Sequence, residues 1–196
     1  MHDYERYLAA VRERPLERET LFRGLVWAIC HVHNQVVTGE REYLRWATTG
    51  ELPNTLPLMR HRGIRDAHRF AYTVNLARFQ RLPLRGKLEA IVGAIYGLSY
   101  AKATFALTCI GQANVACIDV HIGRKYGVRT QWRNAGAYLA SVKQAYGKVH
   151  GSGDEQWRDY YRVIKAFRRS NHAPFFATIG VEVYGQVGLF QQEVAV

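Results

Sequence analysis

The stretch GLSYAKATFALTCIGQANVACIDVHIGR, residues 97–124, contains a single acidic residue, Asp119, within a long basic region. No other acidic side chain occurs between Glu89 and Asp154, whereas Lys and Arg recur throughout that interval. A lone carboxylate among many cations is typical either of a helix N-cap or of a catalytic group in a protein that handles a polyanion. Both interpretations of Asp119 stay open at this point.

The composition indicates a folded, strongly basic protein. The chain has 196 residues, of which 48% are hydrophobic, and its formal net charge is +11 at pH 7. This length suffices for one domain with a proper core or for two small lobes. The charge favours an acidic partner, with nucleic acid ahead of an anionic membrane surface. A surplus of solvated arginines is the alternative.

Neither a signal peptide nor a membrane span is predicted. The first residues, MHDYERYLAAVRERP, carry acids and lack an apolar core. No run approaches the ~18–20 apolar residues that a span needs. Cys30, Cys109 and Cys117 have neither metal-ligand spacing nor an even number, so we expect reduced core thiols and no iron–sulfur cluster. These features predict a cytoplasmic protein with no membrane partner.

Helical periodicity dominates the chain and alternating strand patterns are scarce, which predicts an all-α fold. Pro15 stops the first predicted helix, and Thr20 is the expected N-cap of the second. The predicted helices cover residues 2–14, 21–32, 38–50, 63–82, 85–97, 120–127, 134–149, 154–170 and 175–190, with a further helix before Gly111. No repeat or linker divides residues 1–196, so we expect one compact unit.

Two helices joined by a very short turn are predicted at about residues 86–111. Gly97 permits a backbone geometry at the bend that other residues resist. The unpaired amides at the start of the second helix carry partial positive charge, and together with Lys102 they would bind a DNA phosphate. Such a pair alone is a weak signal, because helical bundles contain many of them.

The segment 60–87 is the most basic part of the chain, with eight Lys or Arg residues against one acid, Asp66. On a helix these cations alternate with apolar residues, so many of them can cover the core with their stems. A phosphate-facing role for some of them is an equally good interpretation.

The pattern GLSYAKA…ACIDVHIGR resembles the helix-hairpin-helix motif and following aspartate of the HhH-GPD DNA glycosylase superfamily, which includes endonuclease III. Within it, the chain is most similar to archaeal and bacterial 8-oxoguanine DNA glycosylases, with their G-x-G-Y-K-x-A hairpin and A-I-x-D-x-H-I-x-R segment. The likeness is ungapped from Gly97 to Arg124 and extends over about residues 20–127. Upstream, LVWAICHVHNQV resembles the helix that leads to the DNA-intruding loop, and GIRDAHRFAYTVNLAR resembles the family's G-x-R-x-x-R-A-x-Y helix.

The resemblance implies a two-lobed helical fold with DNA crossing the cleft between the lobes. The central lobe would span about residues 35–125, and residues 1–34 and 126–196 would form the other lobe. The implied partner is double-stranded DNA with a damaged or modified base, bound by a monomer associated with the nucleoid. No cofactor is implied, although the resemblance allows a monovalent cation at the hairpin.

The resemblance also assigns a reaction, base-excision repair, with 8-oxoguanine as the first expected substrate. The target base is flipped out of the duplex into a pocket. Asp119 would then stabilise the oxocarbenium-like transition state, or activate water, as the N-glycosidic bond breaks.

Family members that also cut the DNA backbone carry a lysine at the fifth position of G-x-G-x-K-x-A, and its amine forms a Schiff base with the sugar. The matching position here is Ala101, and Lys102 follows one residue later. One step along a helix turns a side chain by about 100°, so we expect a monofunctional glycosylase that uses water. The alternatives are a glycosylase/AP lyase with Lys102 as nucleophile and a non-catalytic helix-hairpin-helix module that binds DNA.

The remaining candidate residues also come from the resemblance. Ser99 replaces the hairpin's second glycine, and its hydroxyl would still donate a hydrogen bond. His33 and Asn34 match the place at which the family fills the gap left by the flipped base; a helix C-terminus with satisfied polar groups is the alternative. Phe175 and Phe176 would close the base pocket, although core packing is the favoured interpretation. The expected DNA contacts are thus Gly97, Ser99, Ala101, Lys102, His33, Asn34 and Arg124.

Overall fold

The computed structural model describes residues 3–32, 36–51, 58–147, 153–164 and 172–182. The regular elements in these ranges are all α-helices, which confirms the all-α prediction. They are α1 (Asp3–Arg12), α2 (Arg18–Cys30), α3 (Val36–Thr49), α4 (Leu58–Thr73), α5 (Leu76–Arg81), α6 (Leu84–Ala94), α7 (Tyr100–Cys109), α8 (Val120–Tyr126), α9 (Ala135–Tyr146), α10 (Gly153–Ile164) and α11 (Ala173–Thr178).

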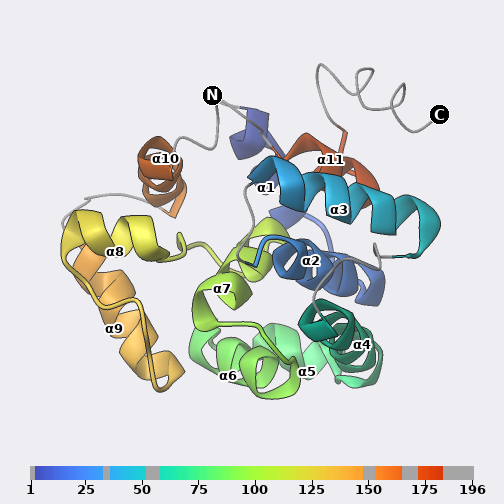
Figure 1. The fold of residues 1–196 in the computed structure, drawn as a ribbon, viewed down its shortest axis with the longest axis horizontal. Helices are drawn as coiled ribbons and strands as arrows, with labels where there is room; N and C mark the ends of the chain where they lie inside the picture. The colour runs from blue at the N-terminus through green and yellow to red at the C-terminus, as the bar shows by residue number, and fades with distance from the viewer. Residues whose placement is uncertain (1–2, 33–35, 52–57, 148–152, 165–171, 183–196) are drawn as a thin grey trace.

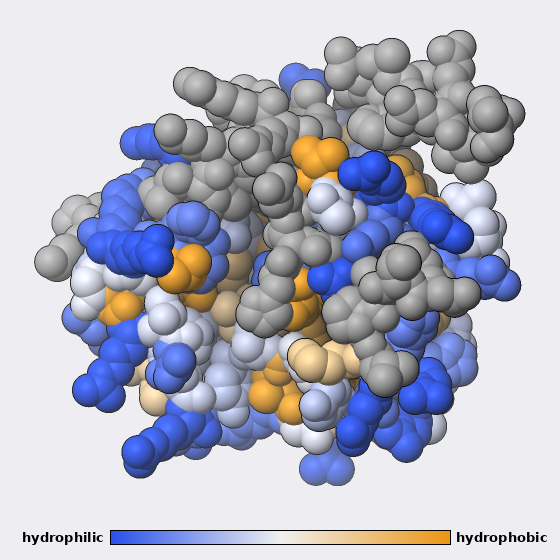
Figure 2. Space-filling model, viewed as in Figure 1, coloured by the Kyte–Doolittle hydropathy of each residue, from blue (hydrophilic) through white to orange (hydrophobic). Residues whose placement is uncertain are grey.

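Helices α2 and α7 lie in the middle of the molecule, with α3 and α11 on one side of them and α4, α5 and α6 on another (Figure 1). The pair α8 and α9 lies beside α7, and α10 packs against α8. In the same view, hydrophilic residues cover the rim over α4 and α9, and hydrophobic residues show nearer the middle of this face (Figure 2).

One hydrophobic cluster receives buried side chains from each of these helices. Trp27 is fully buried at its centre and stacks on Phe175 with ring centroids 5.2 Å apart. Close packing of α2 on α7 requires Gly24, because a Cβ at this position would lie 2.4 Å from Cγ2 of Ile110. The three cysteines are buried free thiols in this core, as predicted.

Several helix boundaries differ from the predictions. Helix α4 begins at Leu58, five residues before its predicted start, and α6 ends at Ala94, three residues before its predicted end. The predicted helix 63–82 is two helices, because Asn75 takes an extended conformation and its side chain accepts the amide of Arg78 as an N-cap. Thr20 was the wrong cap for α2, which begins one residue after Glu17. Helix α11 ends at Thr178, so residues 179–182 do not continue it. Residues 165–170 and 183–190 of the last two predicted helices lie outside the described ranges.

Helix α2 belongs to the outer lobe in the division inferred from the sequence, yet it packs on α3, α4 and α7 of the central lobe. Helix α9, also assigned to the outer lobe, packs on α6. The division of the chain into two lobes stays a prediction. None of them is both long enough and apolar enough to cross a membrane.

Candidate active site

The predicted hairpin consists of α6, a turn over residues 95–99, and α7. Gly97 has φ of +82°, and a Cβ built on it would meet nothing within 4 Å. Glycine is thus required here by the backbone conformation and not by crowding. Ser99 is the N-cap of α7, and its Oγ accepts the amide of Lys102 at 3.3 Å. This bond satisfies one of the amides that the hairpin was expected to offer to a phosphate.

Asp119 is the N-cap of α8, one of the two roles predicted for it. Its Oδ1 accepts the amides of His121 and Ile122 at 2.9 and 3.0 Å. Its Oδ2 is outside this cap and accepts a hydrogen bond of 3.2 Å from the hydroxyl of Tyr160 on α10. The Asp119 side chain is half-buried, so it does not point into a sealed interior.

The backbone that leads to Asp119 is held by two phenols of α9. The Tyr138 hydroxyl accepts the amide of Ile118 at 3.4 Å, and the Tyr146 hydroxyl donates to the carbonyl of Cys117 at 3.1 Å. Both tyrosines are buried. Because buried phenols have few alternative partners, these bonds fix the position from which Asp119 starts α8.

Lys102, in the first turn of α7, does not extend into solvent beside the hairpin. Its Nζ lies 5.5 Å from the centroid of the Phe105 ring, and its side chain is half-buried. Burial lowers the pKa of the Lys102 ammonium below its ordinary value, and the nearby Cys117 and Asp119 oppose this only in part. The charge of Asp119 therefore acts on Lys102, although Ala101 occupies the matching lysine position of the family.

Comparison with Lys87, which is buried, shows what is unusual about Lys102. Nζ of Lys87 donates to the carbonyl and to Oε1 of Gln112 at 3.3 and 3.1 Å, so its burial is compensated by hydrogen bonds. Within the described part of the chain, Nζ of Lys102 has no such bond. Burying an amine without hydrogen bonds is costly, and packing alone gives no reason for it.

Among the described residues, none of the other sequence-derived candidates forms a hydrogen bond with the Asp119 side chain. Ala101 is half-buried against the core, and Arg124 is exposed in the last turn of α8. Phe175 and Phe176 are fully buried core residues, with Phe176 packed on Tyr7 at a centroid distance of 5.0 Å. His33 and Asn34 lie outside the described residues.

Tyr160 is the residue of this site that the sequence analysis missed. It lies 41 positions after Asp119, on a helix that carries two tyrosines and a tryptophan, and no spacing rule marks it out. Its neighbour Asp159 accepts hydrogen bonds from Lys125 at 2.7 Å and from Tyr126, which fastens α10 to α8. This attachment brings Tyr160 to Asp119.

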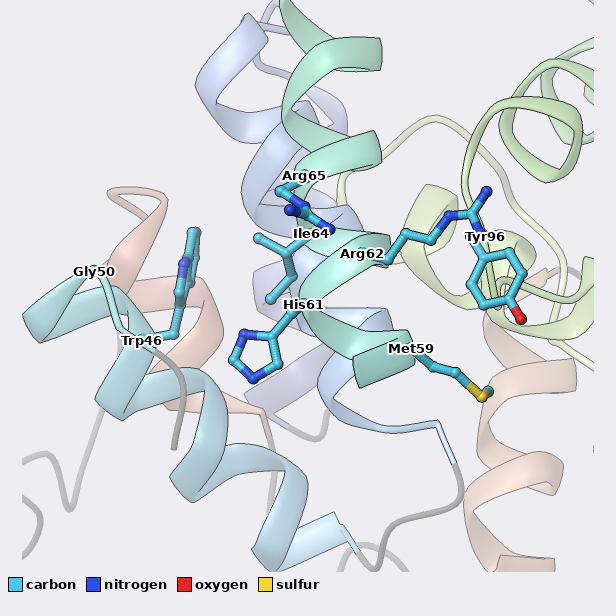
Figure 3. A pocket seen from close by; sticks show the side chains of 8 residues that line it. All are labelled: Trp46, Gly50, Met59, His61, Arg62, Ile64, Arg65 and Tyr96. Carbon is cyan, nitrogen blue, oxygen red and sulfur yellow. The ribbon is translucent and has the colours of Figure 1, made fainter. Parts of the chain in front are cut away.

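A groove of about 630 Å³ lies beside the hairpin turn. Trp46 of α3 and His61 of α4 face each other on one side of it, and Arg62 reaches toward Tyr96 of the turn on the other (Figure 3). The guanidinium of Arg62 lies 4.2 Å from the centroid of the Tyr96 ring. This groove was not predicted, because its lining comes from separate parts of the chain.

Comparison of the chain with protein families, curated proteins and solved structures found no match.

Proposed function

We propose that the protein is a DNA glycosylase that cleaves the N-glycosidic bond of a flipped, damaged or modified base. 8-Oxoguanine is the first substrate to test. Three features support the proposal: the net charge of +11, the hairpin with its glycine at φ +82°, and the carboxylate that follows it. The proposed chemistry depends on Asp119, and the main support for the proposal is the arrangement of hydrogen bonds around its two carboxylate oxygens.

The decisive observation is that the helix cap uses only one oxygen of Asp119. A residue retained purely as an N-cap needs Oδ1 alone, since one acceptor satisfies the first amides of the helix. Oδ2 is held by Tyr160 in a half-buried setting, where the charge of Asp119 also acts on Lys102. A carboxylate fixed at both oxygens is preorganised to face positive charge that develops on a reacting sugar.

In the proposed reaction, the bond between C1′ and the base nitrogen breaks and the electron pair leaves with the base. Positive charge spreads over C1′ and the ring oxygen, and Asp119 stabilises it. Water attacks C1′ and loses its proton, which restores neutrality and leaves an abasic site. The base departs with a proton from solvent.

A second candidate, a glycosylase with lyase activity, is favoured by one observation. Burial lowers the pKa of Lys102, and a lower pKa raises the fraction of free amine that can attack C1′. The amine would replace water as nucleophile, and loss of the base with ring opening would give a Schiff base. This lysine chemistry competes with the water mechanism that the hairpin alignment favours.

A panel of duplex oligonucleotides, each with one modified base, tests the proposed function. The expected result is release of at least one base by the wild-type protein, seen as strand cleavage after alkaline treatment. A covalent protein–DNA complex in the presence of borohydride, lost in Lys102→Ala and kept in Lys143→Ala, would establish the lyase. Binding of DNA without release of any base would instead identify a non-catalytic module.

A further inference from the structure

Two cations of the basic segment 60–87 line the groove beside the hairpin, and others are held in close ion pairs. Arg60 donates to Glu42 at 2.6 Å and Arg69 donates to Asp66 at 2.6 Å, so both serve the fold. Arg62 lies 3.9 Å from Asp66 and its side chain is 60% exposed. Arg65 is exposed and has no ion pair with any described residue. Arg62 and Arg65 both line the groove beside the hairpin.

The groove combines these cations with aromatic rings. Trp46 stands at one side and Tyr96, 45% exposed, at the other, and no acidic residue occurs among the described residues that line it. A positively charged groove with aromatic platforms is the arrangement by which proteins hold single-stranded nucleic acid, because every unpaired base offers a face for stacking. Bases in an intact duplex do not offer that face.

The groove is joined directly to the hairpin turn. The amide of Tyr96 donates to Oδ2 of Asp66 at 3.2 Å, and Gly63 approaches so closely that a Cβ there would lie 3.0 Å from the Tyr96 carbonyl oxygen. These contacts hold the turn against α4. A strand gripped by the hairpin would therefore continue into the groove.

We infer that this groove binds an unpaired segment of DNA next to the duplex, with bases stacked on Trp46 and Tyr96 and phosphates held by Arg62 and Arg65. The inference rests on the proposed function only in that the hairpin binds the adjoining duplex. It gives the enzyme a preference for bases that lie near a single-strand junction.

Fluorescence anisotropy with undamaged, labelled DNA tests this inference. A duplex with a single-stranded oligo-dT overhang should bind wild-type protein at least about fivefold more tightly than the blunt duplex, as ~1 kcal/mol of base stacking gives. Arg62→Ala/Arg65→Ala should abolish this gain. The charge-matched control Arg129→Ala/Arg133→Ala, in exposed positions between α8 and α9, should bind both duplexes more weakly and keep the gain.

Trp46→Phe keeps an aromatic ring in the groove and should reduce the gain in affinity without removing it. Arg65→Ala alone should also reduce the gain, and it leaves the contact between Arg62 and the Tyr96 ring intact. Equal binding of tailed and blunt duplexes by the wild type would overturn the inference, as would an unchanged gain in the groove variant. The DNA in this binding assay contains no damaged base, so the outcome does not depend on whether the protein excises bases. Binding of oligo-dT without binding of the blunt duplex would support the groove as a site for single-stranded DNA and would contradict the role of the hairpin in binding the duplex.

Discussion

The hydroxyl of Tyr160 donates a hydrogen bond of 3.2 Å to Oδ2 of Asp119 and thereby joins α10 to the first turn of α8. Since Oδ1 is bound by two amides of α8, both oxygens of the carboxylate are fixed. Tyr160 is thus a positioning residue in the proposed reaction. Its role there is to orient the acid.

Tyr160→Phe should slow single-turnover base release about ten- to a hundredfold, the effect of one hydrogen bond to a charged group. Affinity for the lesion duplex should stay unchanged, because the hairpin is untouched. Tyr126→Phe is the matched control, since its hydroxyl donates to Asp159 and not to Asp119. Equal slowing in both variants would mean that Tyr160 acts only through the packing of α10.

Lys102→Met should stabilise the fold, because it removes a buried ammonium without breaking a hydrogen bond to a described residue. We expect a gain on the order of 1 kcal/mol at pH 7, or about 2–4 °C in Tm. A lowered native pKa means that the wild type gains stability as the pH rises through that pKa toward the ordinary lysine value, so the difference between the two proteins should shrink with rising pH.

Lys87→Met is the matched control for this prediction and should lower stability by about 1–2 kcal/mol, since its Nζ bonds to Gln112 are lost. Thermal unfolding of the three proteins measures both effects. Destabilisation of both lysine variants to the same degree would show that Lys102 has a structural role.

Asp159→Asn should make the free energy of unfolding less dependent on pH in the acidic range. Burial by itself would raise the pKa of Asp159, but hydrogen bonds from Lys125 and Tyr126 outweigh it, and the pKa is lowered. Such a group adds stability at neutral pH that is lost as the pH falls through the native value. The variant should lose about 1–3 kcal/mol at pH 7, and urea unfolding should show a smaller difference from wild type below about pH 4. A difference that is constant with pH would contradict this.

Gly97→Ala tests the hairpin turn. Its φ of +82° should cost an alanine about 1 kcal/mol, with no clash to add to it. Gly93→Ala, in α6 with open space around it and no positive φ, should instead stabilise by about 0.5–1 kcal/mol. Weaker binding of duplex DNA by Gly97→Ala alone is the expected result, and equal binding by both variants would exclude the turn from the DNA contact.

Local sequence signals were enough to predict most of the helices. Helical periodicity identified the helices on either side of Gly97, and a lone aspartate before a predicted helix gave the cap of α8 correctly. Periodicity failed at Asn75, because the apolar pattern continues across a residue whose side chain caps a new helix. Thr20 resembled a cap but lies inside α2, which starts at an extended Glu17 without a side-chain bond.

The site depends on contacts between distant segments, and single-sequence patterns do not encode those. Tyr160 reaches Asp119 because Asp159 fastens α10 to α8, and nothing in the spacing predicts that. That Lys102 points away from the base pocket stays a prediction of the hairpin alignment, and the alignment did not indicate that the charge of Asp119 acts on this lysine. The sequence alone did not distinguish among the arginines of the segment 60–87, and it is their position at the groove that separates Arg62 and Arg65 from the rest.

Asp119→Asn separates the two roles of this residue most directly, because asparagine caps a helix as well as aspartate does. We expect unchanged thermal stability, unchanged or tighter binding of lesion DNA, and loss of base release by a factor of about 100 or more, as removal of a preorganised charge stabiliser gives. Undiminished base release by the Asn variant on the substrate that the wild type processes would show that Asp119 is only a cap.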